Sequence, residues 1–89
     1  MSAPPVVTLY GRADCHLCDE ARALLEPLAR ELGLRLVEVD IDSDPAAELR
    51  YRWAIPVVCV EGGEVARAPI RRGPLEAALR AAAASAQAR

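Results

Sequence analysis

The spacing of apolar residues changes several times along the chain and predicts strands that alternate with helices. Short β-branched and apolar runs, which are typical of strands, lie at residues 6–10, 34–41, 55–60 and 65–68. The first run is almost entirely apolar, so we expect a central strand that is buried on both faces. Between residues 15 and 32, apolar residues recur three and four positions apart with charged residues opposite, which predicts an amphipathic helix.

Residues that start and stop secondary structure support the same order of elements. Gly33 is expected to end the first helix. Cap residues and a proline at 42–45 predict a second helix that runs to about Trp53. The composition of residues 61–64 is that of a hairpin turn, so the last two strands should be antiparallel neighbours. A third helix is expected to open at residues 73–74.

Length and composition describe one globular domain. With 89 residues, we expect a single domain over residues 1–89, with frayed tails at 1–5 and 85–89. Arginine supplies all eleven positive side chains and the net charge is -2, without a basic and aromatic stretch, which argues against nucleic-acid binding. We also expect no membrane partner and a cytoplasmic location, because no signal-peptide pattern opens the chain and no apolar run approaches the roughly 20 residues of a membrane span.

Cys15 and Cys18 are the candidate reactive groups of the chain. They lie three residues apart, where the first strand gives way to the first helix. On a helix that begins at Cys15, the two sulfurs share one face, within the roughly 5.5 Å Cα separation that a disulfide accepts. The first helical turn has unpaired N–H groups and the positive end of the dipole, which stabilise a thiolate on Cys15 and leave Cys18 as the resolving thiol. Cys59 lies among valines and is expected to be a small buried hydrophobe.

The predicted order βαβαββα, with a dithiol at the first strand–helix junction, resembles the thioredoxin fold in its short, glutaredoxin-like form. Residues 9–18 are similar to the strand, loop and dithiol of glutaredoxins. Residues 55–57 resemble the cis-proline loop of the superfamily, and residues 62–63 resemble its hairpin turn. Within this group, residues 15–21 are most similar to a bacterial glutaredoxin-like family. The resemblance implies an α/β fold with a four-stranded mixed sheet flanked by helices.

The same resemblance implies a thiol-disulfide oxidoreductase. Cys15 would attack a disulfide in a protein or in a glutathione adduct, and Cys18 would then displace the substrate. A reductase system must reset the pair, with glutathione as a candidate electron donor, and we expect no bound cofactor and a monomer. The alternative is a non-enzymatic module that holds a metal, an iron–sulfur cluster or a partner protein through the dithiol. We expect no metal site, since zinc needs four ligands and only His16 and Cys59 remain to complete such a set.

Five neighbouring residues are candidates for substrate binding or for tuning the dithiol. Arg12 stands where glutaredoxins usually have a lysine that contacts a glutathione carboxylate, although a solvated surface arginine is the alternative. A protonated His16 would favour a thiolate on Cys15 and Asp14 would disfavour it, unless His16 is merely exposed. In the family, the residue before the cis-proline pairs with the substrate backbone, so Ile55 and Pro56 are implied as binding residues. The alternative is a trans proline that begins an edge strand.

Two further pairs of residues have open roles. Tyr51 and Trp53 are expected to pack in the core or at its rim, and the alternative is a place beside the substrate groove. The Gly-Gly-x-Asp-Asp stretch with which glutaredoxins anchor the γ-glutamyl group is missing. Residues 66–70 stand in its place. Arg71 and Arg72, which precede the final helix, are expected to compensate nearby acidic residues, with an anion site as the alternative.

Overall fold

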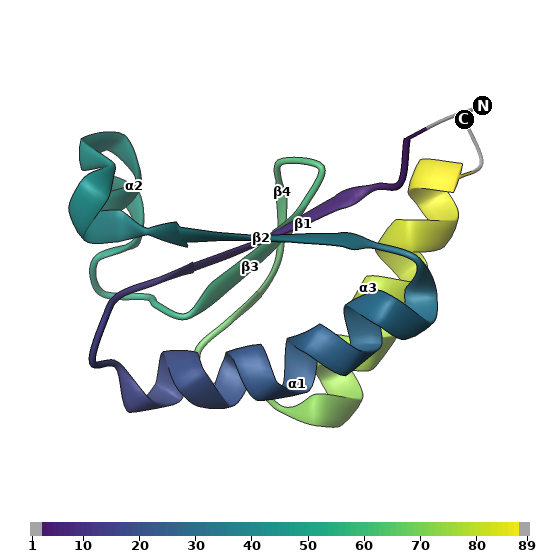
Figure 1. Ribbon diagram of the computed structural model, residues 1–89, viewed down its shortest axis with the longest axis horizontal. Helices are drawn as coiled ribbons and strands as arrows, with labels where there is room; N and C mark the ends of the chain where they lie inside the picture. The colour runs from purple at the N-terminus through teal and green to yellow at the C-terminus, as the bar shows by residue number, and fades with distance from the viewer. Residues whose placement is uncertain (1–2, 88–89) are drawn as a thin grey trace.

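The computed structural model describes residues 3–87 and contains a four-stranded sheet with three α-helices (Figure 1). The elements are β1 (Val6–Gly11), α1 (His16–Leu32), β2 (Arg35–Asp40), the 3-10 turn η1 (Ile41–Ser43), α2 (Pro45–Tyr51), β3 (Val57–Val60), β4 (Gly63–Arg67) and α3 (Arg72–Gln87). The predicted βαβαββα order is confirmed, and most of the boundaries lie within two residues of those expected.

The sheet is mixed, and β1 lies inside it. The strand order is β2-β1-β3-β4, with β1 parallel to β2 and antiparallel to β3. The last two strands, β3 and β4, are antiparallel neighbours as predicted. Because β1 and β2 are parallel, the loop that leads to α1 and the segment that leads to α2 leave the sheet at the same edge. That edge carries the dithiol.

Each face of the sheet packs against its own apolar cluster. Helices α1 and α3 cover one face, and α2 lies on the other side of the sheet (Figure 1). On the first face, Leu25 of α1 and Leu75 and Leu79 of α3 are buried against Val7 and Leu9 of β1. Each of these leucines stabilises the fold by about 1.5–3 kcal/mol relative to an exposed position.

The second cluster is smaller, because α2 has only seven residues. It contains Ile41, Ala47, Tyr51, Val57 and Cys59. Burial along β1 alternates as a result, with one set of side chains buried and the other half-buried. The expectation that this strand is buried on both faces is therefore wrong, since the short helix covers only part of the second face.

The ends of the described chain have more structure than expected. Helix α3 continues to Gln87, beyond the position at which fraying was predicted. Pro5 is buried, and its carbonyl accepts a hydrogen bond from the backbone N–H of Arg35 at 2.9 Å, which ties this residue to β2. The remainder of the two expected tails includes residues 1–2 and 88–89, which lie outside the described residues. Within residues 3–87, no helix has both the length and the apolar composition needed to cross a bilayer.

Candidate active site

The two cysteines lie where β1 passes into α1, and helix capping determines their geometry. Cys15 is the N-cap residue, with an extended backbone at φ -103° and ψ 109°, so α1 begins one residue later than expected. Its Sγ accepts a hydrogen bond from the backbone N–H of Cys18 at 3.3 Å. A side-chain oxygen usually fills this role at a helix N-terminus. The cap therefore places the sulfur of Cys15 against the first turn of the helix.

Burial distinguishes the two free thiols. Cys15 is partly exposed, whereas Cys18 is 1% exposed. Burial, followed by a side-chain hydrogen bond with Cys15, raises the pKa of Cys18 from 9.0 to about 11, and the backbone N–H of Arg12 acts in the opposite direction. Cys18 is therefore a protonated thiol near neutral pH. Cys15 is the sulfur that an external disulfide can reach.

Gly11 packs closely against the side chain of Cys18, a contact that the sequence did not predict. A Cβ at position 11 would lie 3.0 Å from Sγ and 3.2 Å from Cβ of Cys18. Both distances are shorter than the roughly 3.5–4.0 Å at which carbon atoms pack best. A glycine after an apolar run is also typical of an ordinary turn, so the local pattern contains no signal for this contact.

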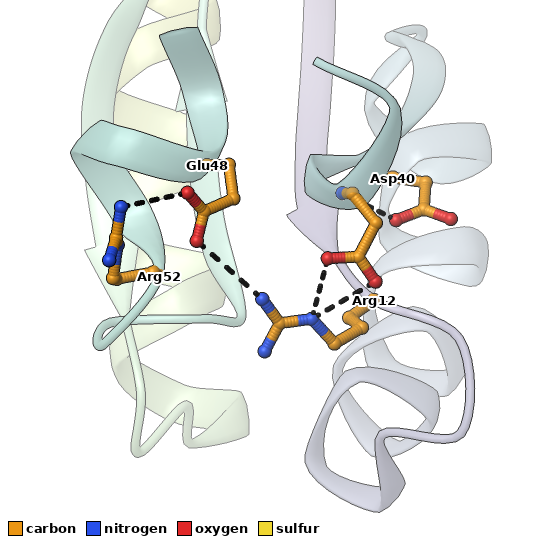
Figure 2. Close-up of polar contacts among 5 residues, drawn as sticks. Arg12, Asp40, Glu48 and Arg52 are labelled. Carbon is orange, nitrogen blue, oxygen red and sulfur yellow. Dashed lines mark hydrogen bonds and ion pairs between the residues drawn. The ribbon is translucent and has the colours of Figure 1, made fainter. Parts of the chain in front are cut away.

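Acidic residues of η1 and α2 hold the side chain of Arg12 (Figure 2). Its Nε donates to both carboxylate oxygens of Asp42, at 3.0 and 3.2 Å, and its Nη2 lies 4.0 Å from Oε2 of Glu48. Glu48 in turn accepts a hydrogen bond from Arg52 at 2.9 Å. Arg12 is thus an ion-paired surface residue whose side chain is 37% exposed. Binding of a glutathione carboxylate stays a prediction, and such a ligand would compete with Asp42 and Glu48.

His16 and Asp14 lie at the surface beside the dithiol. Nε2 of His16 is 2.8 Å from Oε2 of Glu20, one helical turn later, and the histidine side chain is 87% exposed. Asp14 is exposed and has a φ of 59°, in the left-handed region that Asp tolerates better than most residues. In the described part of the chain, neither side chain is hydrogen-bonded to a thiol. Their influence on Cys15 stays a prediction.

The proline loop lies at the same edge of the sheet as the dithiol. Tyr10 of β1 pairs with Val57 of β3, and these strands are antiparallel, so the residues beyond this pair are Gly11 on one strand and Pro56 on the other. Pro56 is buried, and the peptide bond that precedes it is cis, as the family resemblance implies. The register thus brings the loop next to the end of β1 from which the dithiol follows.

The backbone of Ile55 is only partly available to a substrate. Its N–H donates a hydrogen bond to the carbonyl of Tyr51 at 3.2 Å. The carbonyl of Ile55 is the remaining group that could pair with an extended peptide. The predicted binding role of Ile55 and Pro56 therefore requires either this carbonyl or a displaced N–H.

The two aromatic residues near this loop differ in burial. Tyr51 is 7% exposed and packs with its ring centroid 4.8 Å from that of Tyr10. Its hydroxyl lies 3.7 Å from Sγ of Cys59, which is buried as predicted. Burial and this contact raise the pKa of Tyr51. Trp53 is 92% exposed, so the packing expected for it is wrong, because α2 ends at Tyr51 and Trp53 lies in the turn that follows.

Two arginines lie at the start of α3: Arg71 directly precedes the helix, and Arg72 is its first residue. Arg71 and Arg72 are exposed and form no ion pair with any other residue in the range 3–87. Their expected compensation of nearby acidic residues is therefore wrong. In the same range, no group of three or more His, Cys, Asp or Glu side chains is arranged to hold a metal ion.

Known proteins share the fold of this chain. The family model described as glutaredoxin-like domain (DUF836) matches residues 6–80. The target protein XcR50 from X. campestris is 39% identical, with a TM-score of 0.70 over 84% of this chain and 96% of that one. Protein Ne2328 from Nitrosomonas europaea is 26% identical, with a TM-score of 0.71 over 86% and 93% of the two chains. A mutant thioredoxin from Halobacterium salinarum shares the fold, with 17% identity and a TM-score of 0.71 over 89% and 74%. The fold is therefore thioredoxin-like, and the protein belongs to the glutaredoxin-like domain family.

Proposed function

We propose that this protein is a thiol-disulfide oxidoreductase in which Cys15 is the nucleophile and Cys18 the resolving cysteine. The family and the Cys-x-x-Cys pair in a thioredoxin-like fold support a redox-type module. The observation that carries the proposal is the unequal placement of the two sulfurs. Cys15 is partly exposed at the helix N-cap, and Cys18 is buried one turn inside, with its backbone N–H 3.3 Å from the sulfur of Cys15.

The reaction follows from this arrangement in two displacement steps. Cys15, as a thiolate, attacks one sulfur of the substrate disulfide, and the other sulfur leaves as a thiolate with the electron pair of the broken bond. Cys18 then loses its proton and attacks Sγ of Cys15. The second half of the substrate leaves as a thiolate, and a disulfide joins Cys15 to Cys18. The dithiol has given two electrons to the substrate, and an external reductant returns them.

We propose protein disulfides and glutathione mixed disulfides as the substrates. Glutathione and a thioredoxin reductase system are the candidate electron donors. Reduction of the oxidised protein by each donor, followed as loss of the Cys15–Cys18 disulfide by mass spectrometry, identifies which of them resets the pair.

Three cysteine variants test the assignment. Cys15→Ser should abolish reduction of a protein disulfide, and Cys18→Ser should accumulate a mixed disulfide on Cys15 that intact-mass spectrometry detects. Cys59→Ala is the control, because Cys59 is buried in the cluster beneath α2. It should retain turnover. Activity in Cys15→Ser, or an oxidised protein without a Cys15–Cys18 disulfide, would refute the proposal.

A further inference from the structure

The outer face of α2 exposes large apolar side chains. Leu49 and Trp53 are the two most exposed large apolar residues in the range 3–87, at 73% and 92%. They are four positions apart, and Arg52 between them keeps a helical backbone at φ -51° and ψ -32°, so their side chains are neighbours one turn apart. Ala46, three residues before Leu49, is also exposed on this face. Ala46, Leu49 and Trp53 form an apolar surface, the outer stripe of α2, that the rest of the described chain leaves uncovered.

The outer stripe lies at the end of the sheet that carries the dithiol. The carboxylate of Glu48 bridges Arg12 and Arg52, with contacts of 4.0 and 2.9 Å (Figure 2). Arg12 precedes Cys15 by three residues, so these ion pairs hold the C-terminal end of α2 beside the loop that leads to the dithiol. Figure 1 shows α2 and the start of α1 at the same end of the molecule. Arg52 directly precedes Trp53, so a protein whose disulfide reaches the dithiol can also contact the outer stripe.

The charges beside the outer stripe favour an acidic partner. Arg50 follows Leu49, is exposed, and forms no ion pair with any described residue between 3 and 87. Its guanidinium carbon lies 5.9 Å from the ring centre of Tyr51, which holds the charge at the edge of α2. On the other side of the stripe, Glu48 and Arg52 neutralise each other. The surface is therefore complementary to a carboxylate that stands beside apolar side chains.

The size of the outer stripe distinguishes a transient partner from a permanent one. Helix α2 has seven residues, so one side of it measures about 10 Å by 10 Å. Stable protein–protein interfaces bury about 800 Å² on each partner, several times this area. The outer stripe is therefore too small to hold a permanent dimer by itself. A substrate must leave after each turnover, and one exposed tryptophan can supply a large share of the binding energy of such a small contact.

We propose, on the basis of the function proposed above, that the outer stripe of α2 docks the protein that carries the substrate disulfide. Trp53 and Leu49 contact apolar side chains of that protein, and Arg50 pairs with a carboxylate beside them. These residues take no part in the exchange of bonds at Cys15. They raise the affinity for polypeptides that are apolar and acidic around their cysteine, and small disulfides react without them.

Three synthetic peptides test this preference by their rates. Each has one cysteine in a disulfide with a nitropyridine thiol, which leaves as a coloured thiolate when Cys15 attacks the peptide sulfur. The first peptide has leucine, phenylalanine and aspartate on both sides of its cysteine. The second has serine in place of the apolar residues, and the third has lysine in place of aspartate. At low peptide concentration, the wild type should react with the first peptide about tenfold faster than with either of the others.

Variants of this surface and a small disulfide separate docking from chemistry. Trp53→Ser should slow the reaction with the first peptide to the rate of the serine peptide. Arg50→Gln should remove the preference for aspartate over lysine. Trp53→Phe retains an apolar ring and should keep most of the preference for apolar residues. The symmetric disulfide of the nitropyridine thiol has no peptide to dock, so it should react at the same rate with the wild type and all three variants.

Trp53 also reports its own burial, because it is the only tryptophan in the sequence. Cys18→Ser traps the mixed disulfide between Cys15 and a peptide. In the adduct with the first peptide, tryptophan emission should shift to shorter wavelength and acrylamide should quench it less, whereas the adduct with the serine peptide should keep the emission of an exposed tryptophan.

Three results would overturn docking at the outer stripe. The first is unchanged emission in the adduct with the first peptide, and the second is an equal rate with all three peptides. The third is self-association of the protein that Trp53→Ser abolishes, since this would assign the outer stripe to a second copy of the chain. Failure of the symmetric disulfide to react at Cys15 would instead overturn the proposed function, and the docking role with it.

Discussion

Substitution of Gly11 by alanine tests how closely the dithiol packs on the sheet. The added Cβ would lie 3.0 Å from Sγ and 3.2 Å from Cβ of Cys18, which is 1% exposed. We expect overpacking at this position to cost about 1–3 kcal/mol. The loss of chain freedom in the unfolded state returns about 0.4–1 kcal/mol, since the backbone at Gly11 does not require a positive φ. The net loss should be about 1 kcal/mol, which lowers Tm by about 4–8 °C in a domain of this size.

Urea denaturation of the reduced protein, followed by far-ultraviolet circular dichroism, measures this loss. Tryptophan fluorescence suits the purpose less well, because Trp53 is 92% exposed. Gly73→Ala is the control, since an added Cβ there meets nothing within 4 Å. In a Cys18→Ala background, which lacks the sulfur, Gly11→Ala should cost at least about 0.5 kcal/mol less. An equal cost in both backgrounds, or a cost no greater than that of the control, would refute the close contact between Gly11 and Cys18.

Two further predictions concern protonation and charge at the site. Because the pKa of Cys18 is raised from 9.0 to about 11, the folded protein holds this proton more tightly than the unfolded chain does. The resulting stabilisation is complete below about pH 9 and is lost towards pH 11, so urea midpoints of reduced wild type should fall more over this window than those of Cys18→Ala. Parallel curves would contradict the raised pKa. Arg12→Ala should increase KM for a glutathionylated substrate. Asp42→Asn should decrease this KM, because Asp42 competes with the substrate for the guanidinium of Arg12. Unchanged steady-state constants in both variants would exclude Arg12 from the binding site.

Local patterns predicted the fold well because each element depends on interactions along its own segment. The recurrence of leucines three and four positions apart determines which face of α1 is buried, and Leu25 and Leu28 are indeed 0% and 2% exposed. The residues around Gly62 predicted the hairpin because a glycine there adopts a φ of 84°, which other residues rarely do. Trp53 escaped prediction because its exposure depends on where α2 ends, and helix boundaries are set by caps and tertiary contacts more than by periodicity.

The dithiol was predictable for the same reason, and its surroundings were not. Cys15 and Cys18 are three residues apart, so one turn of helix brings them together whatever the rest of the chain does. The ion pair between Arg12 and Asp42 joins residues 30 positions apart, and it exists only because β1 and β2 are parallel and end at the same edge of the sheet. Both charged residues can be read from the sequence, but the distance between them cannot.

Strand β2 shows most clearly why local sequence patterns can fail beside the dithiol. In β2 the apolar residues Val37 and Val39 alternate with the charged residues Glu38 and Asp40, and this alternation normally indicates that the charged side chains face away from covering helices. The ion pair of Glu38 with Arg22 shows the opposite, because the charged side chains lie on the same face as α1. A strand can direct carboxylates beneath a helix only where the helix offers polar partners or leaves a cavity, and the first turns of α1 do both. A one-residue slip between β1 and β2 would move Asp40 to the other face. The face to which Asp40 is directed therefore depends on the register of these two strands, which no local pattern in the sequence specifies.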